Sequence, residues 1–186
     1  MRKNFGAKPL CFPQPVFIIG TYGEDGTPDA MNAAWGGISE EDEVTICVSA
    51  GHRTTKNFMA RGAFTVSMAT ADQVTACDYV GIESGNRVPD KVARTGWTVL
   101  KSEFVDAPLF AELPMALECQ VKSYDPETCR LVGRIVNVSA DESVLGDNGM
   151  VDPDKLRPIT FDPMNHTYRE LGRVVAKAFD EGKKMK

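Results

Sequence analysis

The chain has 186 residues and a formal net charge of −5, with 26 acidic and 21 basic side chains. This acidic balance argues against the basic surface typical of nucleic-acid-binding proteins, so we expect no nucleic-acid partner. No apolar run approaches the roughly 18–20 residues that span a bilayer, so we expect no membrane-crossing helix. Pro9, Pro13 and Pro15 interrupt any signal-peptide core near the N-terminus, so we expect a cytoplasmic protein. The length suits one domain over residues 1–186.

The first half of the chain predicts strands joined by tight turns and one helix. Apolar runs predict strands over 16–22, 28–34, 44–49 and 63–68, with a turn at Asp25-Gly26. Between the last two strands, residues 54–61 predict a two-turn helix. This helix is expected to end at Gly62, because glycine readily adopts the left-handed conformation that follows a helix.

The second half adds helices, a long hairpin and a predicted C-terminal helix. Residues 71–96 predict two helical segments around a loop, and residues 115–124 and 129–140 predict a hairpin with its turn at Asp125-Pro126. Residues 156–161 predict a last strand. Residues 167–179 predict a helix with one apolar side, made of Leu171, Val174, Val175 and Phe179. The pattern indicates a mainly β fold, a small barrel with Greek-key connections and peripheral helices.

The five cysteines are scattered along the chain. They form no CxxC pair, and no cluster of cysteine and histidine has the spacing of metal ligands. We interpret the cysteines as reduced thiols that pack as small hydrophobic side chains, and we predict no metal site.

Polar and basic side chains gather at the start of the predicted helix. A helix N-terminus exposes unpaired backbone N–H groups and the positive end of the helix dipole, so it attracts anions. A guanidinium nearby can bind two phosphate oxygens at once. A simple helix cap with solvated charges would use the same residue types, so the pattern alone leaves both interpretations open. The cluster consists of Ser49, His52, Arg53, Thr54, Thr55, Lys56 and Asn57.

A second candidate site is the stretch MNAAWGG at residues 31–37. Its alanines and glycines would let a flat ligand approach the backbone closely, while Asn32 offers an amide and Trp35 an aromatic surface. A tight bend around a buried tryptophan is the alternative. A planar heterocycle here, with its phosphate at 49–57, would be a single ligand, and flavin mononucleotide (FMN) has that shape.

The order of these motifs resembles the flavin reductase-like family, and within it the flavoredoxin branch, whose members bind FMN in a split β-barrel. The resemblance covers nearly all of the chain, although no single motif is decisive. The stretches that carry it are NAAWGG (32–37), HRTTKNF (52–58), GAFTVSM (62–68), ESGNRVPDKVARTGWT (83–98), VDAPLFAELPMALECQV (105–121), LVGRIVNVSADESVL (131–145), VDPDKLRPITF (151–161) and YRELG (168–172).

The resemblance implies a set of FMN-binding residues. The isoalloxazine ring would be lined by Asn32, Ala33, Ala34 and Trp35, and the phosphate would be surrounded by Ser49, His52, Arg53, Thr54, Thr55 and Asn57. Lys91 would reach the flavin ring, with Ser84 and Gly85 at the edge of the pocket. The family usually forms homodimers with each flavin near the subunit boundary, so a homodimer is expected.

The function implied by the resemblance is an NAD(P)H-dependent flavin reductase, which passes electrons through FMN to a flavin, metal or protein acceptor. No GxGxxG motif is present, which fits transient binding of the nicotinamide nucleotide, and no catalytic side chain is predicted. One alternative is a flavoredoxin-type protein that keeps FMN bound, exchanges electrons with a redox partner protein and does not oxidise NAD(P)H. Another is a β-barrel that binds a different planar or phosphorylated ligand. The sequence leaves the donor, the acceptor and the choice between NADH and NADPH open.

Overall fold

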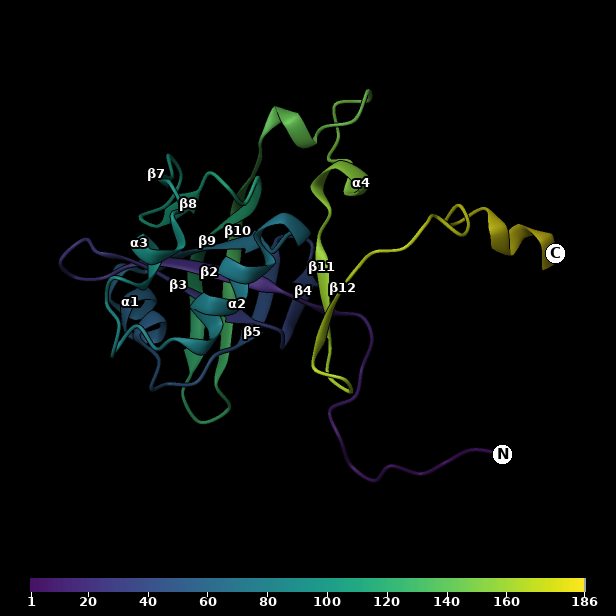
Figure 1. Ribbon diagram of the computed structural model, residues 1–186, viewed down its shortest axis with the longest axis horizontal. Helices are drawn as coiled ribbons and strands as arrows, with labels where there is room; N and C mark the ends of the chain where they lie inside the picture. Colours follow the sequence, from purple (N-terminus) through teal and green to yellow (C-terminus); the bar gives the residue numbers. More distant parts are fainter. Residues whose placement is uncertain (186) are drawn as a thin grey trace.

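Residues 1–185, which the computed structural model describes, form a mainly β protein with a few short helices (Figure 1). The strands are β1 (Gln14–Pro15), β2 (Phe17–Tyr22), β3 (Pro28–Ala33), β4 (Gly36–Glu40), β5 (Glu43–Cys47), β6 (Ala63–Met68), β7 (Val99–Lys101), β8 (Pro108–Phe110), β9 (Met115–Asp125), β10 (Arg130–Ala140), β11 (Ile159–Asp162) and β12 (Thr167–Glu170). The α-helices are α1 (Arg53–Arg61), α2 (Val74–Ile82), α3 (Lys91–Thr95) and α4 (Pro153–Leu156). Short 3₁₀ segments are η1 (Ala71–Gln73), η2 (Glu142–Val144) and η3 (Glu181–Met185). Within these residues, none of the helices is both long and apolar enough to cross a bilayer.

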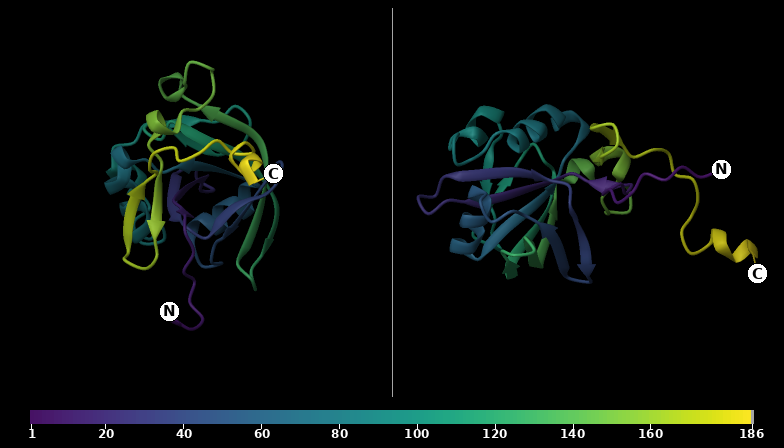
Figure 2. Two further views of the ribbon diagram at one scale, coloured as in Figure 1. Left: turned by 90° about the vertical axis from the view of Figure 1, so that its right-hand side faces the viewer. Right: turned by 90° about the horizontal axis from the view of Figure 1, so that it is seen from below.

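Seven strands form one antiparallel sheet in the order β3-β2-β6-β9-β10-β5-β4. Hairpins join β2 to β3, β4 to β5 and β9 to β10, whereas longer connections place β6 between β2 and β9 and β5 beside β10. The sheet curls around one of its faces (Figure 2), and β1, β11 and β12 form a separate small sheet beside it. The predicted mainly β split barrel is therefore confirmed.

Both faces of the curled sheet are covered by apolar side chains. Ile18 and Ile19 follow one another in β2 and point to opposite faces, because side chains alternate along a strand, and both are fully buried. Ile19 packs with Phe58 of α1 in the apolar cluster on one face of the sheet, which we call the inner core. Ile18 packs with Val80 of α2 and Trp97 in the apolar cluster on the opposite face, which we call the outer core. Burial on both faces explains the continuous apolar run in β2.

Helix α1 is anchored to the inner core at its C-terminal half. The ring of Phe58 lies 6.1 Å from that of Phe64 and 5.4 Å from that of Tyr124, measured between centroids. The helix ends where Gly62 adopts the left-handed conformation (φ 68°) and its N–H donates to the Phe58 carbonyl at 2.8 Å. The predicted helix and its glycine terminus are confirmed, and residues 49–52, which precede α1, are exposed.

Two buried cysteines act as packing residues. Cys119 lies in the inner core and Cys77 in the outer core. Burial raises the pKa of each thiol to about 12, so both remain protonated and poorly nucleophilic near neutral pH. All five cysteines are free thiols.

The C-terminal helix predicted over 167–179 is wrong. Residues 167–170 form strand β12, which pairs with β11, and residues 171–178 have no regular structure. The helical pattern of apolar residues lacks a surface to pack on, since Val174, Val175 and Phe179 are 83%, 84% and 99% exposed. A short helix is marginal in water without such packing, whereas the edge of β11 offers backbone hydrogen bonds to residues 167–170.

Candidate functional site

Helix α1 begins without a side-chain cap. His52 occupies the N-cap position in an extended conformation (φ −71°, ψ 147°) and makes no capping hydrogen bond. Residues 49–52, which lead into the helix, are exposed, and the first turn of the helix carries no acidic residue. Uncapped N–H groups at a helix start carry partial positive charge. The start of α1 therefore has the donors and the electrostatics of an anion site.

The loop between α2 and α3 lies beside this helix start. Arg53 donates from Nη1 to the Gly85 carbonyl at 3.3 Å, and Asn86 donates from Nδ2 to the Gly51 carbonyl at 3.0 Å. Gly85 packs so closely against Asp29 that a β-carbon in its place would lie 2.4 Å from the Asp29 carboxylate. The loop can approach Arg53 in this way because Gly85 has no side chain.

Asp29 of β3 connects the start of α1 to the helices that follow. Its carboxylate accepts a hydrogen bond from Oγ1 of Thr54 at 2.6 Å and lies 3.6 Å from Nζ of Lys91. The side chains of Asp29 and Lys91 are only 2% and 3% exposed. Lys91 also donates to the carbonyls of Val80 (3.0 Å) and Glu83 (2.9 Å) at the end of α2. A single buried carboxylate thus joins β3, α1, α2 and α3.

The ammonium group of Lys91 is surrounded by protein acceptors. Burial lowers the pKa of Lys91 from its ordinary value, and the nearby charge of Asp29 opposes that shift. Its three N–H groups match three acceptors, namely two carbonyls and one carboxylate. Contact between Lys91 and a flavin ring would require one of these partners to be exchanged, and that contact stays a prediction.

The other residues predicted to surround a phosphate differ in where their side chains point. Thr55 donates to the Ser49 carbonyl at 2.8 Å, and Asn57 donates to a threonine hydroxyl of β2 at 3.0 Å; both side chains are buried. These bonds fix the loop and the helix to the sheet. His52 and Ser49 are exposed and Arg53 is partly exposed, so they are accessible to a ligand. The phosphate contacts of all these residues stay predictions.

The residues predicted to line a flavin ring lie at the end of β3 and face different sides of it. Ala33 is buried in the inner core. Asn32 and Ala34 line a recess of about 250 Å³ next to α2 and the small sheet. Trp35 is 42% exposed and lines a recess of about 400 Å³ over β4 and β5. The strand end therefore presents both a polar amide and an accessible aromatic surface, and their contact with a flavin stays a prediction.

Comparison with known proteins identifies the family of the chain. The model of the flavin reductase like domain matches residues 10–167. The chain belongs to the flavin reductase-like family. Its structure is similar to flavoredoxin of Desulfovibrio vulgaris (Miyazaki F), with 38% sequence identity and a TM-score of 0.93 over 98% of this chain and 100% of that chain. The sequence-based assignment to the flavoredoxin branch is confirmed.

Two more distant structures share the fold of this flavin reductase-like chain. Flavoredoxin from Methanosarcina acetivorans is 22% identical, with a TM-score of 0.90 over 100% of both chains. An FMN-binding domain of a flavin reductases-like enzyme from Shewanella baltica OS155 is 17% identical, with a TM-score of 0.78 over 88% of this chain and 89% of that chain.

Four residues that contact the elements around the predicted site are not identified as site residues by the sequence analysis: Asp29, Asp78, Asn86 and Tyr168. An acidic residue within a predicted strand, as at Asp29, signals a buried partner, because a buried carboxylate requires one. The signal does not identify that partner, which lies far along the chain at Lys91. Tyr168 falls in the wrongly predicted helix, and this error hides its hydrogen bond to Asp78 at 2.7 Å.

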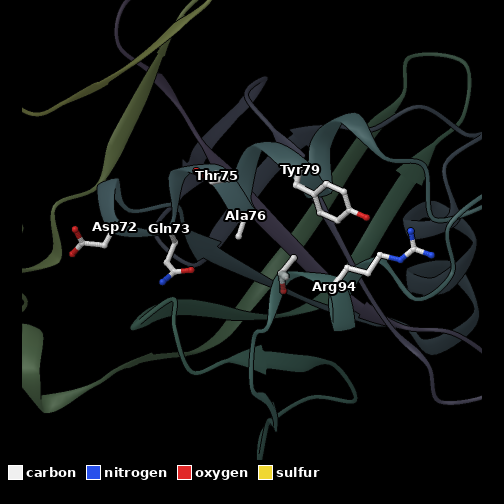
Figure 3. A pocket seen from close by; sticks show the side chains of 7 residues that line it. Asp72, Gln73, Thr75, Ala76, Tyr79 and Arg94 are labelled. Atoms are coloured by element: carbon white, nitrogen blue, oxygen red, sulfur yellow. The ribbon is translucent and has the colours of Figure 1, made fainter.

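A larger recess of about 550 Å³ lies between α2 and α3 (Figure 3). Tyr79 and Arg94 are among the residues that line it, together with Gln73, which accepts a hydrogen bond from Nε1 of Trp97 at 2.9 Å. Arg94 is paired with Asp90 at 3.0 Å, so its charge is already balanced. Because no residue predicted to bind FMN lines this recess, we do not assign it to the flavin site of the flavin reductase-like chain.

Proposed function

We propose that the protein is an FMN-dependent oxidoreductase that passes electrons from NAD(P)H through FMN to a flavin, metal or protein acceptor. The observation that carries this proposal is the uncapped start of α1 beside Arg53, in a chain whose family match spans residues 10–167. Bound FMN would supply the redox chemistry, taking two electrons from a reduced nicotinamide and passing them to the acceptor. The role of the chain is then to bind and orient the cofactor.

The charge balance at the start of α1 suits a phosphate monoester. The uncapped N–H groups and the guanidinium of Arg53 would face the phosphate, as donors with positive character. The hydrogen bond from Thr54 to Asp29 fixes the first turn of the helix, so these donors are held in place before a ligand binds. Asp29 alone would repel a phosphate, but Lys91 at 3.6 Å offsets its charge.

The end of β3 would hold the ring of the cofactor. Ala34 leaves room for a flat ligand near the backbone, and Trp35, 42% exposed, offers an aromatic face to it. Asn32 keeps a side-chain oxygen that can accept from a ring N–H, because its amide nitrogen donates to the Cys77 carbonyl at 3.1 Å. These groups would orient the ring, and they include no nucleophile or acid that the redox step requires.

Anaerobic mixing with NADH or NADPH tests the proposal. We expect the purified protein to carry FMN or to take it up, and we expect one of the two nucleotides to bleach the flavin absorption band. Stopped-flow absorbance at the flavin maximum measures the rate for each nucleotide. Loss of the band with dithionite serves as the control for complete reduction. A protein that binds no FMN at all would contradict the proposal.

A flavoredoxin-type carrier is the second candidate function, favoured by the 38% identity to a flavoredoxin over nearly the whole chain. Such a protein would keep FMN and accept electrons from a reduced partner protein. In the same experiment its flavin would be bleached by dithionite or a reduced carrier protein, and neither NADH nor NADPH would bleach it.

A homodimer is part of the proposal. Apolar side chains on the segment after β12 are exposed in the single chain, and a second copy would give them a surface to cover. Light scattering is expected to give twice the mass of one chain for the intact protein. Deletion of residues 171–186 is expected to lower that mass toward a single chain. A truncated protein that stays dimeric would show that this segment is not part of the interface. The exposed residues are Leu171, Val174, Val175 and Phe179.

A further inference from the structure

The recess of about 550 Å³ between α2 and α3 is a second candidate binding site, separate from the flavin site proposed above (Figure 3). Its volume falls within the roughly 300–1,000 Å³ that is typical of small-molecule sites. None of the residues predicted to hold FMN lines it. The function proposed above therefore leaves these side chains without a role, and their chemistry indicates what the recess binds.

The polar side chains of the recess present hydrogen-bond donors at two separate ends. The side-chain oxygen of Gln73 accepts from Nε1 of Trp97 at 2.9 Å, which orients the amide and leaves its NH₂ group for a ligand. Arg94 donates from Nε to Asp90 at 3.0 Å, and no carboxylate or carbonyl within residues 1–185 accepts from its terminal nitrogens. Figure 3 shows Gln73 at one end of the lining and Arg94, with Tyr79, at the other.

The end formed by Arg94 and Tyr79 has the donors of a carboxylate site. The bond to Asp90 and, to a smaller extent, the nearby Tyr79 raise the pKa of Arg94, so the guanidinium stays charged. A guanidinium presents several N–H donors, and the Tyr79 hydroxyl beside it adds an O–H donor. Charge-assisted hydrogen bonds from such donors are the strongest that a carboxylate forms with neutral or cationic side chains.

The charges around the recess favour a ligand with a single negative charge. Arg94 pairs with Asp90, and Asp72 pairs with Arg157 at 2.5 Å, so the positive and negative charges balance. Figure 3 shows the carboxylate of Asp72 pointing away from the rest of the lining. Since the pair of Arg94 with Asp90 is 56% exposed on both sides, a ligand carboxylate competes easily for the guanidinium. A dianion such as phosphate would meet two aspartates without surplus positive charge, which disfavours it.

The middle of the recess is apolar and firmly held. Ala76 and Tyr79 are half-buried and pack against the outer core, so they supply a fixed apolar surface between the two ends. The hydroxyl of Thr95 donates to the Val92 carbonyl at 2.7 Å and has no hydrogen left for a ligand. A sugar would leave hydroxyl groups without partners here, whereas an aromatic ring needs none.

We propose that this recess binds a small aromatic carboxylate, with its carboxylate on Arg94 and the Tyr79 hydroxyl and its ring against Ala76. The amide of Gln73 would donate to a second polar group at the far end of such a ligand. Because the recess lies apart from the residues predicted to hold FMN, the ligand would be an effector of the protein and not a reactant of the flavin. The proposal does not depend on the FMN function.

Nuclear magnetic resonance of the ¹⁵N-labelled, FMN-loaded protein, titrated with benzoate, tests this site. The chain has two tryptophans, and the indole signal that remains in Trp35→Phe belongs to Trp97, which contacts Gln73 in the recess. Benzoate is expected to move that signal in a saturable way. Benzamide has the same ring without the charge and should bind at least about 10-fold more weakly.

Substitution of Arg94 identifies the group that binds the carboxylate. Arg94→Met is expected to weaken benzoate binding at least about 10-fold, because a charge-assisted contact is lost, and Arg94→Lys should retain part of the affinity. Arg87→Met is the matched control. Arg87 is an exposed arginine in the loop between α2 and α3 that does not line the recess, so its loss should leave benzoate binding unchanged.

Three results would overturn the inference. A Trp97 signal that benzoate does not move would mean that the recess binds no aromatic carboxylate. Unchanged benzoate affinity in Arg94→Met, or an equal loss in Arg87→Met, would mean that the guanidinium of Arg94 is not the carboxylate ligand. Release of FMN by benzoate would place the benzoate in the flavin site. In each case the reduction of bound FMN by NADH or NADPH is measured separately, so the proposed function is tested independently.

Discussion

Replacement of Lys91 by methionine is expected to lower the free energy of unfolding by about 3–5 kcal/mol, because it leaves a buried carboxylate without its cationic partner. Asp29 would keep only the Thr54 hydroxyl as a donor among its observed contacts. The carbonyls of Val80 and Glu83 would also lose the donor that they share. Urea denaturation of the FMN-free protein, followed by circular dichroism, measures the loss without a contribution from ligand binding.

A second change separates the buried charge from a simple packing effect. Asp29→Asn added to Lys91→Met removes the unpaired charge, so the double variant is expected to recover a large part of the lost stability. Arg94→Met is the matched control on the same helix. Its pair with Asp90 is 56% exposed on both sides, so solvent screens it and we expect its loss to change the free energy of unfolding little. Equal losses for Lys91→Met and Arg94→Met would contradict the buried pair.

Local sequence patterns predict most of this fold because they act over short distances. Helix α1 and its end at Gly62 follow from a short polar-apolar pattern closed by a glycine. The long hairpin of β9 and β10 follows from two β-rich runs around Asp125-Pro126. The helix predicted over residues 167–179 is wrong for the same reason, since it also rests on a local pattern. Its helical periodicity is a local signal, but the conformation depends on whether a surface covers the apolar side, which the pattern does not contain.

The candidate site divides in a similar way between local and distant causes. The cluster at 49–57 can be found in the sequence because its residues are neighbours at one helix start. The bond from Thr54 to Asp29 and the pair of Asp29 with Lys91 join residues 25 and 62 positions apart, so no local pattern reveals them. This distant pairing also changes how Thr54 is understood. Its hydroxyl hydrogen is engaged by Asp29. Thr54 is therefore expected to meet an anion through its backbone N–H group and not through its side chain.

Replacement of Arg53 by alanine is expected to weaken FMN binding about 10- to 150-fold, the effect of one charge-assisted hydrogen bond to phosphate. Riboflavin has the same ring but no phosphate, so its affinity should change little. The ratio of the two dissociation constants, from flavin fluorescence titrations of the FMN-free protein, therefore isolates the phosphate contribution. A fall in affinity for both flavins would indicate a disturbed fold rather than a lost phosphate contact.

Lys56 provides a matched control for charge alone. It lies one turn of α1 beyond Arg53 and its side chain is exposed, so Lys56→Ala removes the same charge from the same helix. Solvent and salt screen an exposed charge, and we expect a smaller effect that disappears at high ionic strength. If Lys56→Ala weakened FMN binding as much as Arg53→Ala, the effect would come from the total positive charge near the start of the helix and not from a direct contact of Arg53 with the phosphate.

Asp25 allows a change of the opposite sign. Its carboxylate lies 3.9 Å from Nη2 of Arg53 and is 66% exposed, so it competes weakly for the guanidinium that would bind phosphate. Asp25→Asn is expected to strengthen FMN binding by up to about five-fold, the range of an exposed ion pair, and to leave riboflavin unchanged. A disturbed fold would weaken binding in both variants. If Arg53→Ala weakens FMN binding and Asp25→Asn strengthens it, and neither changes riboflavin binding, the phosphate of FMN is bound beside the guanidinium of Arg53.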